Sequence, residues 1–168
     1  MRLYFFDTCA LQHRYVGGAY SARIRHIVSD SRCQCHIADW TVLEMASALG
    51  RHCRLTGLSC KTYDQLGKRF FEDIACGRLV VRSTTVRDVT RARDLIRFAG
   101  VLRRRNLKSA DALIAAACLD FAYEKAARVI FCTSDWTLYS ILRDINHYSA
   151  ALRLRLIGTP RNGTVGRG

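Results

Sequence analysis

Two short apolar runs, each closely followed by an acidic residue, are the features that most constrain the fold of this chain. Residues 3–6 (LYFF) lead directly into Asp7, and residues 129–132 (VIFC) end three positions before Asp135. A continuous apolar run of this length is typical of a strand that is buried on both faces. We therefore predict two inner strands whose carboxyl ends carry Asp7 and Asp135.

Helical patterns separate these predicted strands. Apolar residues recur at helical spacing in residues 20–28, 37–49, 63–74, 86–102, 109–117 and 138–145. Residues 79–81 and the alternating residues 153–156 predict two further strands, the second of them at a sheet edge. Because parallel neighbours need crossover connections, strands that alternate with helices indicate an α/β sandwich with a mostly parallel central sheet.

Capping residues predict where two of the helices begin. Ser109 is a favourable N-cap for the helix that contains Asp111. The helix predicted at residues 37–49 is entered through Asp39 or Thr41, and the spacing of Thr41 and Glu44 fits a capping box. A capping box would explain Glu44 without any functional role.

Length and charge limit the classes of protein that fit. A chain of 168 residues that is 49% hydrophobic can bury one core, so we predict a single domain at residues 1–157 and a disordered tail at 158–168. The chain shows no signal peptide and no 18-residue apolar stretch, which predicts a cytoplasmic protein without a membrane partner and with its eight cysteines reduced. The net charge of +13 favours a polyanionic partner such as nucleic acid.

Four acidic residues are predicted to gather at one edge of the sheet. Asp7 and Asp135 follow strands, whose carboxyl ends form the usual ligand edge of a parallel sheet. Glu44 and Asp111 lie in the first turns of helices that can open onto the same edge. Clustered carboxylates repel one another without a cation between them, and their oxygens suit Mg²⁺ or Mn²⁺. Taken singly, each acid fits a turn or capping role equally well, so only their convergence would indicate a metal centre.

Four motifs, in this order, resemble those of PIN-domain ribonucleases. They are residues 4–11 (YFFDTCAL), 37–49 with Thr41 and Glu44, 107–116 (LKSADALIAA) and 131–135 (FCTSD). The resemblance covers roughly residues 2–157 and extends to toxins of the VapC type. It implies a three-layer α/β/α fold and metal-dependent hydrolysis of RNA phosphodiesters. It also implies the metal-binding and catalytic residues, which are Asp7, Glu44, Asp111 and Asp135.

The resemblance has further implications for partners and supporting residues. Thr8 and Thr133 would orient a carboxylate or a water molecule through their hydroxyls, although simple capping explains them equally well. An antitoxin protein and a second copy of the chain are the implied protein partners, beside an RNA substrate. One departure from the pattern is Thr137, which stands where VapC-type toxins often have a second acid.

A dense basic run precedes the helix that contains Asp111. Its cationic residues are Arg103, Arg104, Arg105 and Lys108. This run can hold phosphates beside the acids, and a solvated helix end accounts for it equally well.

The sequence also allows functions other than that of a nuclease. The main alternative is a catalytically silent PIN-like module that binds RNA or protein through its basic face, and Thr137 supports it. A phosphotransferase with Asp7 as nucleophile is disfavoured, because Cys9 stands where the haloacid-dehalogenase group has a second aspartate. A zinc site at residues 33–36 (CQCH) is also disfavoured, because the spacing fits no common structural zinc site.

Overall fold

The computed structural model describes residues 1–18, 20–146 and 152–156. The tail predicted at 158–168 lies outside these residues. No helix in the described part of the chain has the length and apolarity that a membrane crossing requires.

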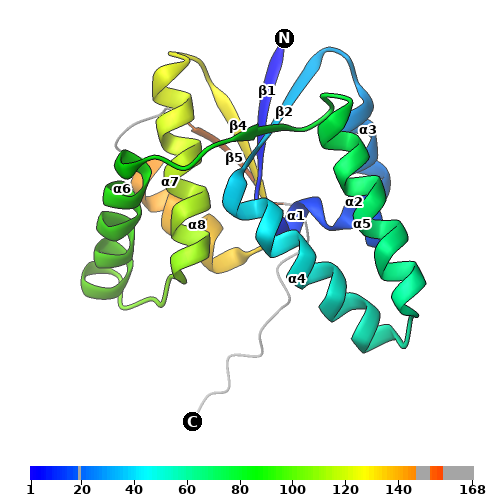
Figure 1. Ribbon diagram of the computed structural model, residues 1–168. Coiled ribbons are helices and arrows are strands. Elements are labelled where there is room, and N and C mark those ends of the chain that lie inside the picture. The colour runs from blue at the N-terminus through cyan, green and yellow to red at the C-terminus, as the bar shows by residue number, and fades with distance from the viewer. Residues whose placement is uncertain (19, 147–151, 157–168) are drawn as a thin grey trace.

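Five parallel strands form the central sheet (Figure 1). The strands are β1 (Arg2–Phe6), β2 (Cys33–Ala38), β3 (Val80–Arg82), β4 (Val129–Thr133) and β5 (Leu152–Leu156). Their order in the sheet is β3-β2-β1-β4-β5, so β1 is the central strand and β5 lies at an edge, as predicted. The predicted parallel arrangement is confirmed for every pair of neighbouring strands.

Helices cover both faces of this sheet (Figure 1). They are α1 (Thr8–Leu11), α2 (His13–Val16), α3 (Ser21–Ser29), α4 (Asp39–Thr56), α5 (Cys60–Ala75), α6 (Val86–Arg97), the π-helical turn η1 (Phe98–Leu102), α7 (Ser109–Glu124) and α8 (Trp136–Asn146). Side chains on β1 alternate between the faces: Phe5 packs with α6, α7 and α8, whereas Tyr4 and Phe6 pack with α1 to α5. Apolar residues on both faces account for the continuous apolar run of β1. The three-layer α/β/α sandwich is thus confirmed.

Strand β2 was missed by the sequence interpretation, which placed residues 37 and 38 at the start of a helix. Gln34 and His36 interrupt the apolar run, so the segment does not look like a buried strand. His36 is nevertheless only 5% exposed and packs against the ring of Phe121 on α7, with ring centroids 4.3 Å apart. Burial and the nearby charge of Lys125 lower the pKa of His36 to about 4, so the ring is neutral at pH 7. A neutral imidazole can therefore take a core position that sequence patterning reserves for apolar residues.

The helix predicted to enter through Asp39 or Thr41 begins at Asp39, whereas the capping box at Thr41 and the N-cap at Ser109 are wrong. The hydroxyl of Thr41 is buried and has no hydrogen-bond partner among the described residues, and α4 begins at Asp39. Ser109 is the first residue of α7 rather than its N-cap, and the N-cap residue, Lys108, makes no side-chain capping bond. A capping role therefore does not account for Glu44.

The strand order places a switch point beside the central strand. From β1 the chain runs outward through β2 to β3, and it then crosses to the other side of β1 to form β4 and β5. Ligands of open parallel sheets bind at the carboxyl ends of the strands where the winding direction reverses. In this protein that place lies between the ends of β1 and β4, where Asp7 and Thr133 are found.

Candidate functional site

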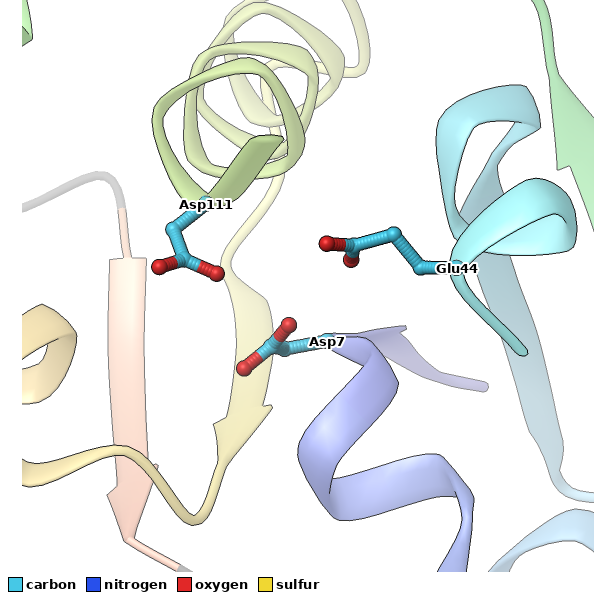
Figure 2. Close-up of side chains that lie close together, drawn as sticks. All are labelled: Asp7, Glu44 and Asp111. Carbon is cyan, nitrogen blue, oxygen red and sulfur yellow. The ribbon is translucent and has the colours of Figure 1, made fainter. Parts of the chain in front are cut away.

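Three carboxylates converge at the switch point (Figure 2). Asp7 follows β1, Glu44 projects from α4, and Asp111 lies in the first turn of α7. One oxygen from each carboxylate lies within 4.8 Å of the corresponding oxygens of the other two. The structure therefore brings together three of the four acids that the sequence singled out.

Asp7 is the most enclosed of these acids, with 2% of its surface exposed. The thiol of Cys9 and the hydroxyl of Thr133 both donate to its Oδ2, at 2.6 Å and 2.7 Å. Burial raises the pKa of Asp7, and the charge of Glu44 adds to that rise, while these two hydrogen bonds oppose it. A hydrogen bond from the backbone N–H of Thr8 also opposes the rise, so three donors hold the Asp7 carboxylate in place.

Glu44 and Asp111 complete the centre from two different helices. The hydroxyl of Thr8 donates to Glu44 Oε2 at 2.7 Å, which fixes the longer side chain. Burial raises the pKa of Asp111 to about 7, and the charges of Asp7, Asp135 and Glu44 contribute to the rise. Carboxylate charges that help to raise the pKa values of Asp7 and Asp111 form an arrangement that a cation would relieve.

Asp135 lies beside the centre without joining the group of three. It lines the same cavity, but its Oδ1 accepts a hydrogen bond from the backbone N–H of Leu138 at 3.0 Å and so caps the start of α8. Its own backbone N–H donates to the hydroxyl of Thr133, also at 3.0 Å. Thr133 consequently links Asp135 to Asp7.

Cationic side chains surround the acids. The cavity that contains the four acids has a volume of about 570 Å³, and its rim carries Arg51, Arg54 and Lys108. Lys108 belongs to the basic run that the sequence singled out, whereas Arg51 and Arg54 were missed. A signal for Arg51 existed, because it follows Glu44 by seven residues and a helix returns to the same face after seven residues.

The other arginines of the basic run do not line this cavity. Arg103 lies 3.4 Å from the carboxylate of Asp144 and over the ring of Phe98, so its charge is partly neutralised. Arg104 and Arg105 are exposed and make no ion pair among the described residues. Arg105 instead donates to the hydroxyl of Ser140 on α8, at the neighbouring surface.

The residues of this site fit a divalent cation of the Mg²⁺ class. Their donor atoms are carboxylate oxygens, which hard cations prefer, and no cysteine or histidine belongs to the group of three. Asp7 is almost fully buried among like charges, which is costly for an ion without a counter-ion. Asp7, Glu44 and Asp111 are the residues that would hold the cation.

Sequence comparisons alone do not place the chain in a family. No protein-family model matches the sequence, and no curated protein is similar to it in sequence. The chain nevertheless has a PIN-like three-layer α/β/α fold with carboxylates at the switch point.

Solved structures of VapBC share this fold across nearly the whole chain. VapBC2 from Rickettsia felis, bound to a DNA fragment from their promoter, has 13% identity and a TM-score of 0.58, over 93% of this chain and 99% of that one. DNA-bound VapBC from Salmonella typhimurium has 15% identity and a TM-score of 0.59, over 92% and 98%. VapBC-1 from nontypeable Haemophilus influenzae has 14% identity and a TM-score of 0.60, over 92% and 97%. Identities this low establish the shared fold.

Proposed function

We propose that this protein is a divalent-metal-dependent endoribonuclease that hydrolyses RNA phosphodiesters, and that it is the toxin of a toxin–antitoxin pair. The observation that carries the proposal is the convergence of Asp7, Glu44 and Asp111 within one cavity whose rim is cationic. The fold shared with VapBC structures supports the role as a toxin with an antitoxin protein as its partner. A second copy of the chain is the other proposed partner.

The side chains of the site divide the work of hydrolysis. When bound, a divalent cation lowers the pKa of a water ligand and neutralises charge on the phosphodiester. Asp7, Glu44 and Asp111 would hold such a cation, and a hydroxyl or thiol donor fixes one oxygen of Asp7 and one of Glu44. Arg51 and Lys108 at the rim neutralise the RNA backbone, which the carboxylates would otherwise repel.

Asp135 has a lesser part in this proposal. One of its oxygens already caps α8, so it acts by orienting a water molecule or by adding negative charge. This arrangement, together with Thr137 two residues later, is what favours the alternative of a catalytically silent module that binds RNA or protein.

Metal-dependent cleavage is the first expected result. Purified protein should cut a labelled, structured RNA pool with Mg²⁺ or Mn²⁺ and stop when EDTA is added, because hydrolysis needs the cation held by the three carboxylates. The Asp7→Asn variant, purified in parallel, measures contaminating nuclease. Cleavage that persists in EDTA, or binding of the pool without any cleavage, would refute the nuclease; the second result would favour the silent module.

The two threonines that donate to the acids should matter for metal binding. Thr133→Val removes a donor from Asp7, and Thr8→Val removes the donor from Glu44. Loss of such outer partners typically costs about 10- to 100-fold in metal affinity or activity. Titration calorimetry with Mn²⁺ and the cleavage assay measure both effects. Thr90→Val is the matched control, because the exposed Thr90 hydroxyl donates to the carbonyl of Val86 within α6. Equal affinities for all variants would contradict the prediction.

A further inference from the structure

A second hollow is lined in part by chain neighbours of residues that line the acidic cavity. It has a volume of about 370 Å³ and is lined by Arg105, Asn106, Trp136, Thr137 and Ser140. The two hollows are close along the chain at two points. Trp136 directly follows Asp135, and Asn106 stands two residues before Lys108, while Asp135 and Lys108 both line the acidic cavity. A chain that enters the acidic cavity therefore has this hollow beside it.

Trp136 gives the hollow an aromatic wall. Trp136 is 48% exposed, although tryptophan is one of the largest apolar side chains. Its ring stacks on that of Tyr139 one helical turn later, with centroids 5.5 Å apart and planes at 23°. Tyr139 thus supports the indole from within α8, and Trp136 lines the hollow. Such a supported aromatic surface is the usual platform for an unpaired nucleobase.

Polar groups line the rest of the hollow. The guanidinium of Arg105 is held by the Ser140 hydroxyl and makes no ion pair among the described residues, so its charge remains available. Asn106 is exposed and carries both donors and an acceptor, and Thr137 adds a hydroxyl. Together these groups match a base edge and a phosphate, whereas an apolar peptide would leave them unpaired.

We propose that this hollow is a nucleobase subsite, in which Trp136 stacks on an unpaired base of RNA next to the phosphate that occupies the acidic cavity. The inference rests on the proposed nuclease function and narrows its substrate to RNA that is single-stranded around the cut. Bases within a duplex are stacked on their neighbours and cannot reach the indole. Thr137, which weakened the case for catalysis when judged from sequence, here belongs to the substrate-binding wall.

Binding without cleavage tests the subsite directly. Anisotropy of a fluorescein-labelled single-stranded RNA oligonucleotide in EDTA gives the affinity of the wild-type protein and of Trp136→Ala and Trp136→Phe. Loss of one stacked base is expected to weaken binding roughly 5- to 100-fold for the alanine variant, while phenylalanine restores most of it. Tyr123→Ala is the matched control, because Tyr123 is 70% exposed and lies about 18 Å from Asp111 along α7.

An oligonucleotide without bases distinguishes binding by base stacking from binding by charge. Trp40→Phe leaves Trp136 as the only tryptophan, and its fluorescence should be quenched by the normal oligonucleotide but not by one of the same length that lacks bases. Equal affinity of Trp136→Ala and wild type, or equal quenching by both oligonucleotides, would overturn the subsite.

The cleavage assay tests the proposed nuclease separately from the base subsite. RNA binding that depends on Trp136, with no cleavage in Mn²⁺, would support the base subsite and refute the nuclease function. Metal-dependent cleavage, with an RNA affinity that does not change when Trp136 is substituted, would refute the subsite and support the nuclease function.

Discussion

The Asp111→Asn variant is expected to lose metal-dependent RNA cleavage almost completely. Asp111 supplies one of the three oxygens that lie within 4.8 Å of one another, and asparagine keeps its shape but not its charge. The loss should exceed the roughly 10- to 100-fold that removal of an outer partner costs, because a proposed cation ligand is removed. In the wild type, cleavage should rise as the pH increases through about 7, since a proton on Asp111 competes with the cation.

The same substitution should stabilise the metal-free protein. The pKa of Asp111 is about 7 in the folded state and close to 3.8 in an unfolded chain, so the folded state binds the proton more tightly. The contribution of Asp111 to the free energy of unfolding therefore falls as the pH rises from about 4 to about 7 and stays low above it. Asparagine does not ionise, so the variant should have a higher melting temperature than the wild type at pH 8 and the same melting temperature near pH 4.

Thermal unfolding in EDTA and the cleavage assay measure these two effects together. The matched control is Asp94→Asn, because the Asp94 side chain on α6 is 60% exposed and, within the described part of the chain, forms an ion pair with its neighbour Arg93 alone. A variant that keeps a tenth of the wild-type cleavage would argue against Asp111 as a metal ligand. A variant that melts at a lower temperature than the wild type at pH 8 would argue against a pKa of Asp111 that is raised by burial and by the neighbouring carboxylates.

Removing Asp73 is expected to have the largest effect on stability. Asp73 of α5 is 3% exposed and accepts hydrogen bonds from Arg14 Nε at 2.5 Å, from the Tyr15 hydroxyl at 2.8 Å and from Arg78 at 3.0 Å. Asp73→Ala leaves the largely buried guanidinium of Arg14 without its partner. Breaking a buried ion pair in this way costs about 3–5 kcal/mol, which urea unfolding can measure.

The stabilisation by Asp73 should also depend on pH. Burial by itself would raise the pKa of Asp73, but the hydrogen bonds from Arg14, Tyr15 and Arg78 outweigh it and hold the pKa below its ordinary value. A lowered folded-state pKa means that this stability is present above about pH 4 and is lost as the pH falls further. Asp94→Ala should change the unfolding free energy by less than about 1 kcal/mol, as exposed pairs do. Similar losses for both variants would show that the Asp73 network is not a major source of stability.

Strand patterns in this chain could be recognised where apolar residues were continuous. The runs at residues 3–6 and 129–132 became β1 and β4, and the alternation at 153–156 became part of the edge strand β5. Strand β2 escaped because His36 and Gln34 broke its pattern, and the burial of a neutral His36 against Phe121 depends on a helix 85 residues away. Local sequence carries no signal for such a contact.

Site residues could be predicted to the extent that they follow strands or begin helices. Asp7, Glu44 and Asp111 were all singled out, and the structure brings them together. The hydrogen bond from Cys9 to Asp7 and the position of Arg54 at the rim were not foreseen. Both depend on side-chain directions that become defined only when α1, α4 and the sheet are packed together.

Sequence alone determined that strands alternate with helices and which segments carry the acids, because strand and helix periodicity and strand-end position are local properties of the chain. Only the tertiary structure decided which acids meet. Asp7 and Glu44 are 37 residues apart and Glu44 and Asp111 are 67 residues apart, and the parallel sheet with its helices closes these separations. It also directed Asp135 to cap α8 and Trp136 to line the neighbouring hollow, since packing of α8 sets where each side chain points.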